Sequence, residues 1–441
     1  MVMVMKLGQS AIFLAIAECV VLGSAGCATF SSRGVAIGES GVSYESPAFT
    51  PDGKTLVFRS QALKVAQGDG AGGDVLASAT DGSGLRRFVG TAAIGKLFLT
   101  PDGRFVLFTS FRDAQTDIYR LDLTSGESTN LTKTPSPETL LQISRDGREV
   151  LLVSRQADQS KLERLDLVTG ERKPLTTSAE HEDRALFSPD GKHVAVRRVI
   201  HPVFSPPIPG EGPDPTGSRS IKSCEKMLLV VVDFETGNEE VLASTAYLSP
   251  ILWAPDSERL LYQDTTKWDI RVVSLRDKDA RIVKSGGYSV AWSGDGLGIL
   301  YLPQNRGSDW AEKPSEVRYI ALDGSREYTV ISDTDFSGMN SAWDRSFGHL
   351  AVFVRPAPLA GSPANSGIMI LGRSAGVVSD RRQWGPMCFY SGLIWSPDGT
   401  QLAYSRRVAG GDPATGGIFV MPVAGGAPRQ VIANQIQWRA K

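Results

Sequence analysis

The sequence is poor in the residues that most often carry chemistry. Its 441 residues include only 4 cysteines and 4 histidines. It has no His-Glu-x-x-His or Cys-x-x-Cys pattern, so the common zinc-site signatures are excluded. We expect no nucleophile elbow of an α/β-hydrolase, because no C-terminal segment is long enough for such a domain. We therefore expect no metal and no other cofactor.

The chain also lacks a block of like charge. Lysine and arginine number 47 and aspartate and glutamate 48, which gives a formal net charge of −1. Nucleic-acid-binding proteins usually present a clustered basic face, so this balance argues against a nucleic-acid partner. Hydrophobic residues make up 41% of the chain and glycines number 46, which is typical of a β-rich globular protein with many turns.

The N-terminus carries the longest apolar stretch. Lys6 precedes a mostly apolar run, residues 7–22, which Glu18 interrupts and which falls short of the roughly 20 residues that span a bilayer. Small residues follow, up to Cys27. Residues 1–27 are predicted to be a signal peptide with a lipoprotein cleavage site, so that Cys27 carries lipid and residues 28–441 are exported to the periplasm or outer membrane of a bacterium.

Two features depart from the usual lipoprotein site. Ser24 stands where such sites carry a branched aliphatic residue three positions before the cysteine, and Glu18 lies inside the apolar run. The alternatives are ordinary cleavage near Ala28 and an uncleaved anchor. Membrane association through Cys27 is the favoured interpretation.

A short phrase recurs along the rest of the chain. An apolar residue is followed by Ser or Thr, then Pro-Asp-Gly, then a β-rich run. The four best copies have their aspartates at Asp52, Asp102, Asp190 and Asp398, and four degenerate copies surround Asp146, Asp256, Asp295 and Asp344. Most spacings between these aspartates are 39 to 54 residues, which suits one four-stranded propeller blade per repeat.

The sequence between the motifs supports this interpretation. After the second copy, residues 105–108 are β-rich, residues 117–123 alternate polar and apolar residues, and residues 128–132 follow a turn. Such alternation is typical of a strand with two unlike faces. The predicted fold class is all-β: a β-propeller of four-stranded antiparallel blades, with eight blades favoured and seven the alternative. Residues 28–441 are predicted to form this single domain.

The repeat resembles a known family. The Ser-Pro-Asp-Gly turn, the aliphatic-aromatic strand and the run Asp117-Ile118-Tyr119-Arg120-Leu121-Asp122-Leu123 are similar to the TolB-type β-propeller repeat. The resemblance covers roughly residues 40–438. That repeat also builds the propeller domains of dipeptidyl-peptidase-like and tricorn-like enzymes, but propellers host many unrelated activities.

Long loops are expected to share one face of the ring. The most unusual is a proline-rich insertion at residues 200–226 in the fourth copy, and long loops in compact folds are often functional. Trp and Arg frequently anchor interfaces. The partner-binding candidates on this face are therefore Phe204, Arg219, Arg306 and Trp310, for each of which local packing within its loop is the alternative.

Two further patterns bear on sites. Cys224 and Cys388 are the two mature cysteines and form a candidate disulfide, with two separate thiols as the alternative. The motif aromatics, among them Trp253 and Trp343, are expected to pack between neighbouring blades rather than line a ligand site.

These observations predict a non-catalytic propeller scaffold, anchored in the cell envelope, that binds protein partners through its loop face. TolB-like proteins suggest this role. The alternative is a propeller enzyme, a hydrolase or lyase, that acts on a glycan or peptide at the channel mouth, using carboxylates and either His181 or His201.

Overall fold

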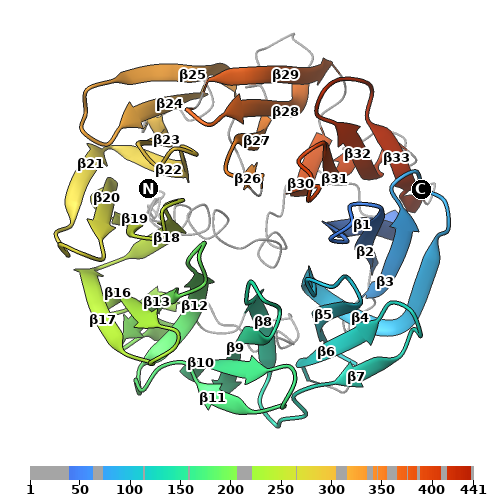
Figure 1. Cartoon of the computed structure of the whole chain (residues 1–441), viewed down its shortest axis with the longest axis horizontal. Helices are drawn as coiled ribbons and strands as arrows, with labels where there is room; N and C mark the ends of the chain where they lie inside the picture. The colour runs from blue at the N-terminus through green and yellow to red at the C-terminus, as the bar shows by residue number, and fades with distance from the viewer. Residues whose placement is uncertain are drawn as a thin grey trace, which may run out of the picture.

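The computed structural model describes residues 39–62, 73–112, 115–156, 159–205, 221–264, 266–303, 315–334, 341–344, 346–354, 365–374, 376–384, 388–408 and 415–438. The regular elements within these residues are β-strands, and their antiparallel sheets stand side by side around a ring (Figure 1). The predicted fold class, an all-β propeller of four-stranded antiparallel sheets, is confirmed.

Each motif copy lies in one four-stranded unit, and we number the units 1 to 8 after the copies. Unit 1 contains β1 (Glu39–Phe49), β2 (Thr55–Ala62), β3 (Gly73–Ala79) and β4 (Arg86–Leu99). Unit 2 contains β4, β5 (Phe105–Ser110), β6 (Asp117–Asp122) and β7 (Ser128–Asn130). Unit 3 contains β8 (Glu138–Ile143), β9 (Glu149–Gln156), β10 (Gln159–Asp166) and β11 (Arg172–Pro174). Unit 4 contains β12 (His181–Phe187), β13 (His193–Ile200), β16 (Lys226–Asp233) and β17 (Glu239–Thr245), with a short ribbon of β14 (Val203–Phe204) and β15 (Ile221–Ser223).

The other half of the ring repeats this order. Unit 5 contains β18 (Leu248–Trp253), β19 (Arg259–Asp264), β20 (Asp269–Ser274) and β21 (Arg281–Ser285). Unit 6 contains β22 (Gly287–Trp292), β23 (Gly298–Pro303), β24 (Ser315–Ala321) and β25 (Glu327–Thr334). Unit 7 contains β26 (Ser341–Trp343), β27 (His349–Val354), β28 (Asn365–Gly372) and β29 (Val377–Trp384). Unit 8 contains β30 (Cys388–Trp395), β31 (Gln401–Val408), β32 (Gly417–Pro422) and β33 (Arg429–Ala433).

Two strands join parts of the ring that are distant in order or sequence. The long strand β4 pairs with β3 and with β5, so it serves as the last strand of unit 1 and the first of unit 2. The C-terminal strand β34 (Gln435–Trp438) pairs with the start of β1, where Trp438 lies opposite Glu39. The two ends of the described chain are therefore held together by a strand pair.

The hydrophobic core is divided among the contacts between neighbouring units. Alternate side chains of a strand point to opposite faces, so Leu107 packs toward unit 3 while Phe108 packs toward unit 1. Each of the eight buried clusters combines residues of two neighbouring units. One of them joins Leu56 and Phe58 of unit 1 to Ala403 and Ile418 of unit 8, which closes the core around the ring.

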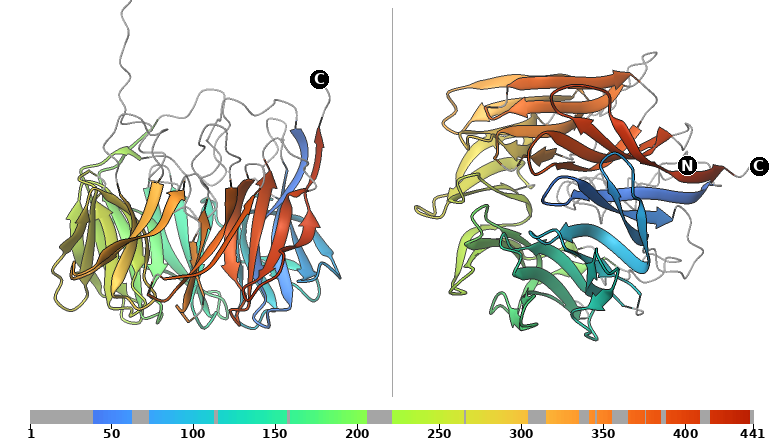
Figure 2. Two further views of the ribbon diagram at one scale, coloured as in Figure 1. Left: turned by 90° about the horizontal axis from the view of Figure 1, so that it is seen from above. Right: turned by 45° about the vertical axis from the view of Figure 1, so that its right-hand side comes forward.

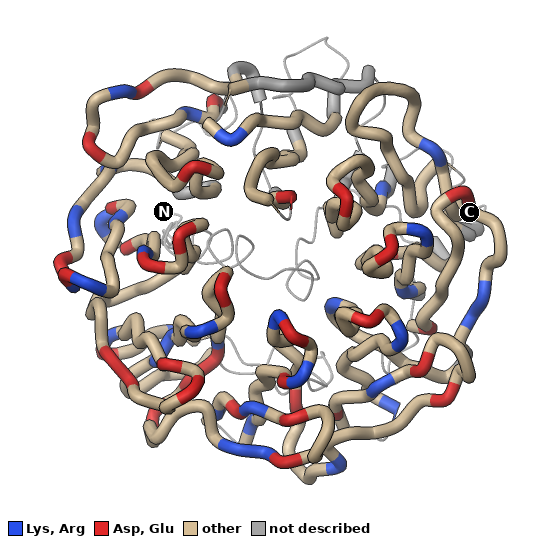
Figure 3. Tube along the Cα trace, viewed as in Figure 1, with Lys and Arg blue, Asp and Glu red and all other residues tan. Residues whose placement is uncertain are grey.

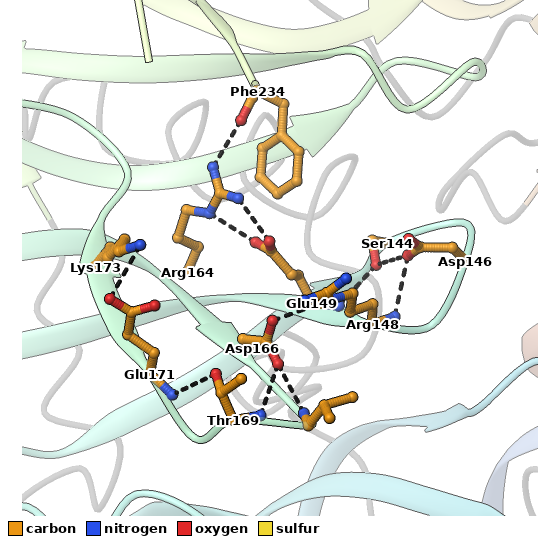
Figure 4. Close-up of polar contacts among 11 residues, drawn as sticks. Ser144, Asp146, Arg148, Glu149, Arg164, Asp166, Thr169, Glu171, Lys173 and Phe234 are labelled. Atoms are coloured by element: carbon orange, nitrogen blue, oxygen red, sulfur yellow. Dashed lines mark hydrogen bonds and ion pairs between the residues drawn. The ribbon is translucent and has the colours of Figure 1, made fainter. Parts of the chain in front are cut away.

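The motif forms the turn between the first two strands of each unit. In the third copy the Ser144 hydroxyl donates to Asp146 at 2.6 Å, and the same carboxylate accepts from the Arg148 backbone N–H at 3.0 Å (Figure 4). The Arg148 side chain also reaches Asp166 in the next turn, at 3.0 Å. Local hydrogen bonds of this kind fix a turn through its own sequence. They explain why the phrase recurs in each copy.

Tryptophans of the motif connect neighbouring units. The indole N–H of Trp253 donates to the backbone oxygen of Leu186 at 2.9 Å, and Trp292 makes the equivalent bond to Leu252 at 3.1 Å. Trp395 repeats it to Ala342 at 2.8 Å. For these three residues the expected packing role is the one the structure shows.

The two faces of the ring differ. In every unit the motif turn lies at one end, and the connection between the second and third strands lies at the other (Figure 2). We call these ends the turn face and the loop face. The first strands of the units lie nearest the ring axis, and we call the surface they form the inner surface (Figure 1).

Candidate functional site

The inner surface is interrupted by β-bulges at one level. The first strand carries a register shift against its neighbour in units 1 to 6 and unit 8, seven units in all. In unit 4 the register passes from Glu182 opposite Arg198 to Arg184 opposite Arg197, so Asp183 is the extra residue. Bulges re-aim side chains and are over-represented next to active sites. This level of the inner surface is therefore the candidate site.

Two equivalent carboxylate–arginine pairs flank the bulges. Arg59 Nη2 lies 3.0 Å from Glu45 Oε2 in unit 1, and Arg197 Nε donates to Asp183 Oδ1 at 2.8 Å in unit 4. In both pairs the acid stands seven residues before the motif aspartate and the arginine seven residues after it. Both arginine side chains are 5% exposed. A buried guanidinium needs a carboxylate partner, so the pairs hold their acids in fixed positions on the inner surface.

The environment of Asp183 keeps it ionised. Burial by itself would raise the pKa of this carboxyl, but the Arg197 guanidinium and the nearby Arg184 and His181 hold the pKa well below its usual range. Arg197 makes a second bond to Asp183, at Oδ2, and donates to the backbone oxygen of Leu248 in unit 5. Asp183 is therefore a fixed negative charge beside the junction of units 4 and 5.

Lys96 lies within the bulge of β4, on the inner surface of unit 2. Its side chain is exposed to solvent, yet the surrounding protein desolvates the ammonium and lowers its pKa. On an outer surface water would surround an exposed lysine and prevent such a shift. Its Nζ lies 5.4 Å from the centre of the Phe98 ring.

Arg184 occupies the equivalent position in unit 4. Like Lys96, it stands six residues before the motif aspartate of its own unit. Its side chain is half-buried, and it follows directly after the bulged Asp183. The inner surface therefore presents two basic side chains at one level, on units 2 and 4. Such a surface attracts an anionic group, and a lowered pKa increases the share of neutral lysine amine that can accept a proton.

His181, one of the two histidines predicted for catalysis, is buried. Its ring nitrogens lie 3.2 and 3.1 Å from Ser160 Oγ, and its ring packs against Phe204 with centroids 5.2 Å apart. The Ser160 hydroxyl donates to the backbone oxygen of Glu182. A serine with no exposed surface cannot meet a substrate, so this pair has a packing role.

Glu182 and its equivalent Glu138 anchor the connections between units. Both side chains have no exposed surface, and burial raises the pKa of each. Glu182 accepts a hydrogen bond from Thr176 at 2.5 Å and pairs with Arg198, whereas Glu138 accepts one from Thr134 at 2.9 Å. These acids are shielded from a ligand and stabilise the fold.

His201 lies on the loop face and is exposed. Its Nδ1 is 2.8 Å from Glu225 Oε2, and the side chains are 74% and 53% exposed. The hydrogen bond from His201 is the main cause of the lowered pKa of Glu225. His201 and His181 therefore lie in different settings, and only His201 is accessible at the surface.

The structure describes one of the four predicted partner-binding residues, Phe204. Phe204 is half-buried, lies in the short strand β14 and packs against the core shared by units 4 and 5, which is the local packing alternative. Arg219, Arg306 and Trp310 lie outside the described residues, as does the lipidation candidate Cys27. Of the four partner-binding candidates, Phe204 is thus the one that the structure describes, and a surface shared by the four stays a prediction.

The candidate disulfide is not formed in the structure. Cys224 is a free thiol whose Sγ lies 3.7 Å from the backbone oxygen of Ala246, and burial raises its pKa. It belongs to unit 4, whereas the backbone of Cys388 pairs with Val408 in unit 8. The two residues belong to different units, and the bridge between them stays a prediction, since even parity of cysteines is no substitute for proximity.

One motif was overlooked at the level of sequence. Gly372-Arg373-Ser374-Ala375-Gly376 has the Gly-x-Ser-x-Gly spacing of a nucleophile elbow. It lies in the turn between β28 and β29, where the Ser374 hydroxyl donates to Asp295 at 3.1 Å. An elbow requires a strand followed by a helix, so the spacing is a coincidence of turn residues.

Two further features are absent from the residues that the structure describes, a metal-binding cluster and a membrane-spanning helix. Among these residues, no group of three or more His, Cys, Asp or Glu side chains is arranged to hold a metal ion. No helix in this part of the chain is long and apolar enough to cross a membrane.

Solved structures resemble the ring over most of its length. Porphyromonas gingivalis dipeptidyl peptidase 4 matches with a TM-score of 0.56 and 12% identity, over 88% of this chain and 59% of that one. A prolyl endopeptidase matches with a TM-score of 0.50 and 12% identity, over 92% of this chain and 57% of that one. Vibrio parahaemolyticus oligogalacturonate lyase matches with a TM-score of 0.49 and 15% identity, over 87% of this chain and 98% of that one. No curated protein matches the sequence.

These comparisons correct the predicted function. We expected a non-catalytic scaffold, but the two solved structures with a TM-score of at least 0.50, a dipeptidyl peptidase and a prolyl endopeptidase, are enzymes. The prediction of a scaffold that binds protein partners through its loop face is therefore wrong as the main interpretation. At this level of identity the likeness itself establishes the shared fold and no particular activity.

A family model matches the first part of the repeat. Residues 29–199, which span the first four motif copies, match the model of the TolB beta propeller domain. The remaining copies continue the same turn, strand order and inter-unit packing around the ring. The first four copies are thus similar to the TolB beta propeller domain, and the other four repeat their structure.

Proposed function

We propose that this protein is a propeller enzyme, a hydrolase or lyase, that acts on an acidic glycan or peptide at the inner surface of the ring. The observation that carries the proposal is the placement of Lys96 and Arg184 at equivalent bulges of β4 and β12, the first strands of units 2 and 4. The two carboxylate–arginine pairs lie at the same level.

The proposed roles follow from the chemistry of these side chains. Arg184 carries a permanent charge and is suited to hold a substrate carboxylate, such as that of a uronic acid or a peptide terminus. Lys96 is the proposed proton acceptor, since its lowered pKa increases the share of neutral amine. Asp183 and Glu45 are the proposed positioning residues for the substrate, because their arginine partners hold these two carboxylates in place beside the bulges.

In the lyase form of this reaction, Lys96 takes the proton from the carbon next to the carboxylate. The electron pair left behind forms a carbon–carbon double bond, while the bond to the leaving glycosyl oxygen breaks and that oxygen gains a proton from water. In the hydrolase form, the amine accepts a proton from a water whose oxygen bonds to the attacked carbon, the bond from that carbon to the leaving group breaks, and the leaving group gains a proton from a second water. Both forms need an anionic substrate, so they share one test.

The N-terminal segment and the family suggest where the reaction takes place. We propose that residues 1–27 direct export and that Cys27 is lipidated, so that residues 28–441 form the propeller in the bacterial envelope. The apolar run before Cys27 and the TolB-like repeat support this location. Envelope glycans and peptides are therefore the first substrates to test.

The experiment is an activity screen of purified protein against acidic and neutral glycans and against peptides. Lyase products are detected by the ultraviolet absorbance of the new double bond, and hydrolysis by new reducing ends or amines. Lys96→Met is expected to lower the rate at least ~100-fold, the usual contribution of a general base. Lys54→Met, an exposed lysine of the first motif turn, serves as the matched control.

Two results would contradict the proposal. If no acidic glycan or peptide is turned over, the protein is not the enzyme proposed here. If activity is found but Lys96→Met and Arg184→Met retain it, the reaction takes place elsewhere on the molecule.

A further inference from the structure

The turn face carries an aromatic cavity that the proposed reaction does not use. It has a volume of about 400 Å³ and is open to solvent. Three units of the ring supply its lining, namely units 4, 5 and 7: Leu186, Phe187, Pro189, Ile251, Leu252, Trp253, Trp343, Asp344 and Phe347. Four of these nine side chains are aromatic and one is a carboxylate, so the lining combines π faces with a single negative charge.

The seventh motif copy departs from the others in the residues that build this cavity. The Phe347 backbone N–H donates to the Asp344 backbone oxygen at 3.1 Å, which is the bond that the motif glycine makes in other copies, as Gly399 does to Ser396. Phe347 therefore stands where most copies have glycine. Its φ is 55°, in the left-handed region that a bulky residue rarely adopts. Backbone strain of this kind is concentrated at functional sites.

The sixth motif copy, in the neighbouring unit 6, also departs from the motif, at the position that contacts Trp343 and Phe347. Gly294 replaces the motif proline in unit 6, and a Cβ at this position would lie 2.8 Å from the Trp343 ring. The Gly294 N–H, which proline would lack, donates to the backbone oxygen of Arg373 at 2.8 Å. Trp343 and Phe347 then lie with ring centroids 6.0 Å apart. The two departures from the motif thus combine to place an aromatic pair at the cavity.

The opposite wall of the cavity is also held in place. The Trp253 indole N–H donates to the backbone oxygen of Leu186, which fixes the ring of Trp253 against unit 4. Phe187 packs edge-on against Phe234, with centroids 4.9 Å apart. Both lining rings remain half-buried rather than fully covered. The aromatic wall is therefore preformed and accessible.

Charge around the turn face favours a cation at this cavity. Figure 3 shows acidic residues on the turns nearest the ring axis. The residue after the motif glycine position is basic in units 1 to 4, but in units 5 to 8 it is Glu258, Leu297, Gly348 and Thr400. Arg259 in unit 5 is held by Asp256, at 2.6 Å, and by the backbone oxygen of Gly296. The half of the turn face that includes Trp343 is therefore the less basic half.

The state of Asp344 decides which kind of cation fits. Its Oδ1 accepts from the Ser346 N–H and hydroxyl and from the Gly348 N–H, at 2.8 to 3.0 Å, and Oδ2 lies 3.0 Å from His349 Nδ1. Because both carboxylate oxygens of Asp344 already accept hydrogen bonds from its own turn, the residue offers the cavity its negative charge but few free acceptor positions. A primary ammonium needs acceptors for three N–H donors, whereas a quaternary ammonium needs none and is attracted by aromatic faces.

We propose that the cavity between Trp253 of unit 5 and Trp343 and Phe347 of unit 7 is a binding site for a quaternary ammonium group of the trimethylammonium class. The aromatic faces surround the methyl groups, and Asp344 provides the negative charge. This site is independent of the reaction proposed at Lys96, because its lining includes neither Lys96 nor Arg184 nor a member of the two carboxylate–arginine pairs.

The test measures binding of choline and tetramethylammonium to the purified full chain by calorimetry. The neutral comparison is 3,3-dimethyl-1-butanol, in which carbon replaces the choline nitrogen. Choline is expected to bind about tenfold or more tightly than this alcohol, because cation–π attraction is lost in the neutral compound. Ethanolamine, a primary ammonium, is expected to bind more weakly than choline.

Three variants locate the site. Phe347→Gly restores the motif residue and removes the left-handed strain, so it is expected to fold while binding choline about tenfold more weakly. Asp344→Asn is expected to weaken choline but not the neutral alcohol. Tyr328→Ala, at an exposed position outside the lining, is the matched control and should bind choline like the unaltered protein.

The proposal is overturned if choline and the neutral alcohol bind equally, if neither binds, or if Phe347→Gly binds choline as well as the unaltered protein. Tighter binding of ethanolamine than of choline would also overturn it, in favour of a site for a primary amine. Phe347→Gly restores the residue that most copies have, so this variant is expected to fold. If its circular dichroism matches that of the unaltered protein, a loss of choline binding does not result from unfolding.

Discussion

Gly53, in the first motif copy, lies against Pro397 of the eighth: a Cβ on Gly53 would stand 3.7 Å from the proline Cδ. The same relationship recurs between neighbouring copies, where Gly103 faces Pro51 and Gly147 faces Pro101. The motif proline and glycine are therefore partners across units as well as residues of one turn. The contact between the first and last copies belongs to the closure of the ring, together with the pairing of β34 with β1.

This relationship predicts unequal effects of glycine substitutions. Gly103 has a φ of 70°, and a Cβ there would lie 2.8 Å from Pro51. Gly237 has a φ of 74°, but a Cβ there would meet nothing within 4 Å. Gly237→Ala is expected to lower the free energy of unfolding by about 1 kcal/mol, and Gly103→Ala by about 2 to 3 kcal/mol, since overpacking adds to the backbone strain.

Thermal or urea unfolding of the two variants measures the difference. If both alanine variants lose the same stability, the contact between the motif proline and glycine of adjacent units contributes nothing.

The carboxylate–arginine pairs predict a dependence of stability on pH. Asp183→Asn leaves the Arg197 guanidinium buried without its partner, so the free energy of unfolding at pH 7 is expected to fall by about 3 kcal/mol. The pKa of Asp183 is lowered in the folded protein, so its contribution is complete above the unfolded pKa of about 3.9 and is lost as the pH falls below that value.

Urea unfolding at pH 7 and at a series of acidic pH values checks this. The gap between the unaltered protein and Asp183→Asn should narrow as the pH falls. Glu45→Gln is the comparison in unit 1, where the acid is 30% exposed against 19% for Asp183, so its effect at pH 7 should be smaller. A gap that stays constant with pH would show that the charge of Asp183 does not stabilise the fold.

The tryptophan bonds between units predict a cost for replacing the indole. Trp395→Phe keeps an aromatic ring but removes the N–H that donates to Ala342, and Trp395 is 6% exposed. The free energy of unfolding is expected to fall by about 1 to 3 kcal/mol, because the Ala342 oxygen loses its donor and part of the ring volume is lost. Chemical unfolding compares it with Trp343→Phe, whose ring lines the open cavity and should cost less.

The lowered pKa of Lys96 predicts unusual reactivity of its amine. Only the neutral amine reacts with an acylating reagent, so the rate of modification of Lys96 should reach half its maximum at a lower pH than that of the lysine side chain in a short peptide. Mass spectrometry of the protein and of the peptide, treated with a small reagent over a range of pH, gives both curves. Coincident curves would remove Lys96 as the proposed proton acceptor.

Much of the fold could be predicted because its information is local. In each copy the Ser or Thr, the Asp and the Gly form the turn with their own hydrogen bonds, as Ser144 and Asp146 do. The alternation over residues 117–123 likewise reflects a strand with two distinct faces, now seen as β6 between two core clusters. The degenerate copies keep part of the phrase around their aspartates, and each lies in a four-stranded unit.

The candidate site could not be predicted, because its residues have no signature of their own. Lys96 and Arg184 are ordinary basic residues in the sequence; only the folded chain places them at bulges and desolvates Lys96, which lowers its pKa. Their shared distance from the motif aspartate was a signal that spacing could have supplied. His181 attracted attention through its acidic neighbours, yet the fold buries it against Phe204.

The sequence by itself determined the repeat, the turns and the strands, since each depends on residues that are close along the chain. Only the tertiary structure decided what the departures from the repeat mean. Phe347 and Gly294 look like decay of the motif and are separated by 53 positions, but they lie in contact because their units are neighbours in the ring, and Phe347 lines the cavity. Contacts between units are set by packing across the ring, and no local pattern encodes them.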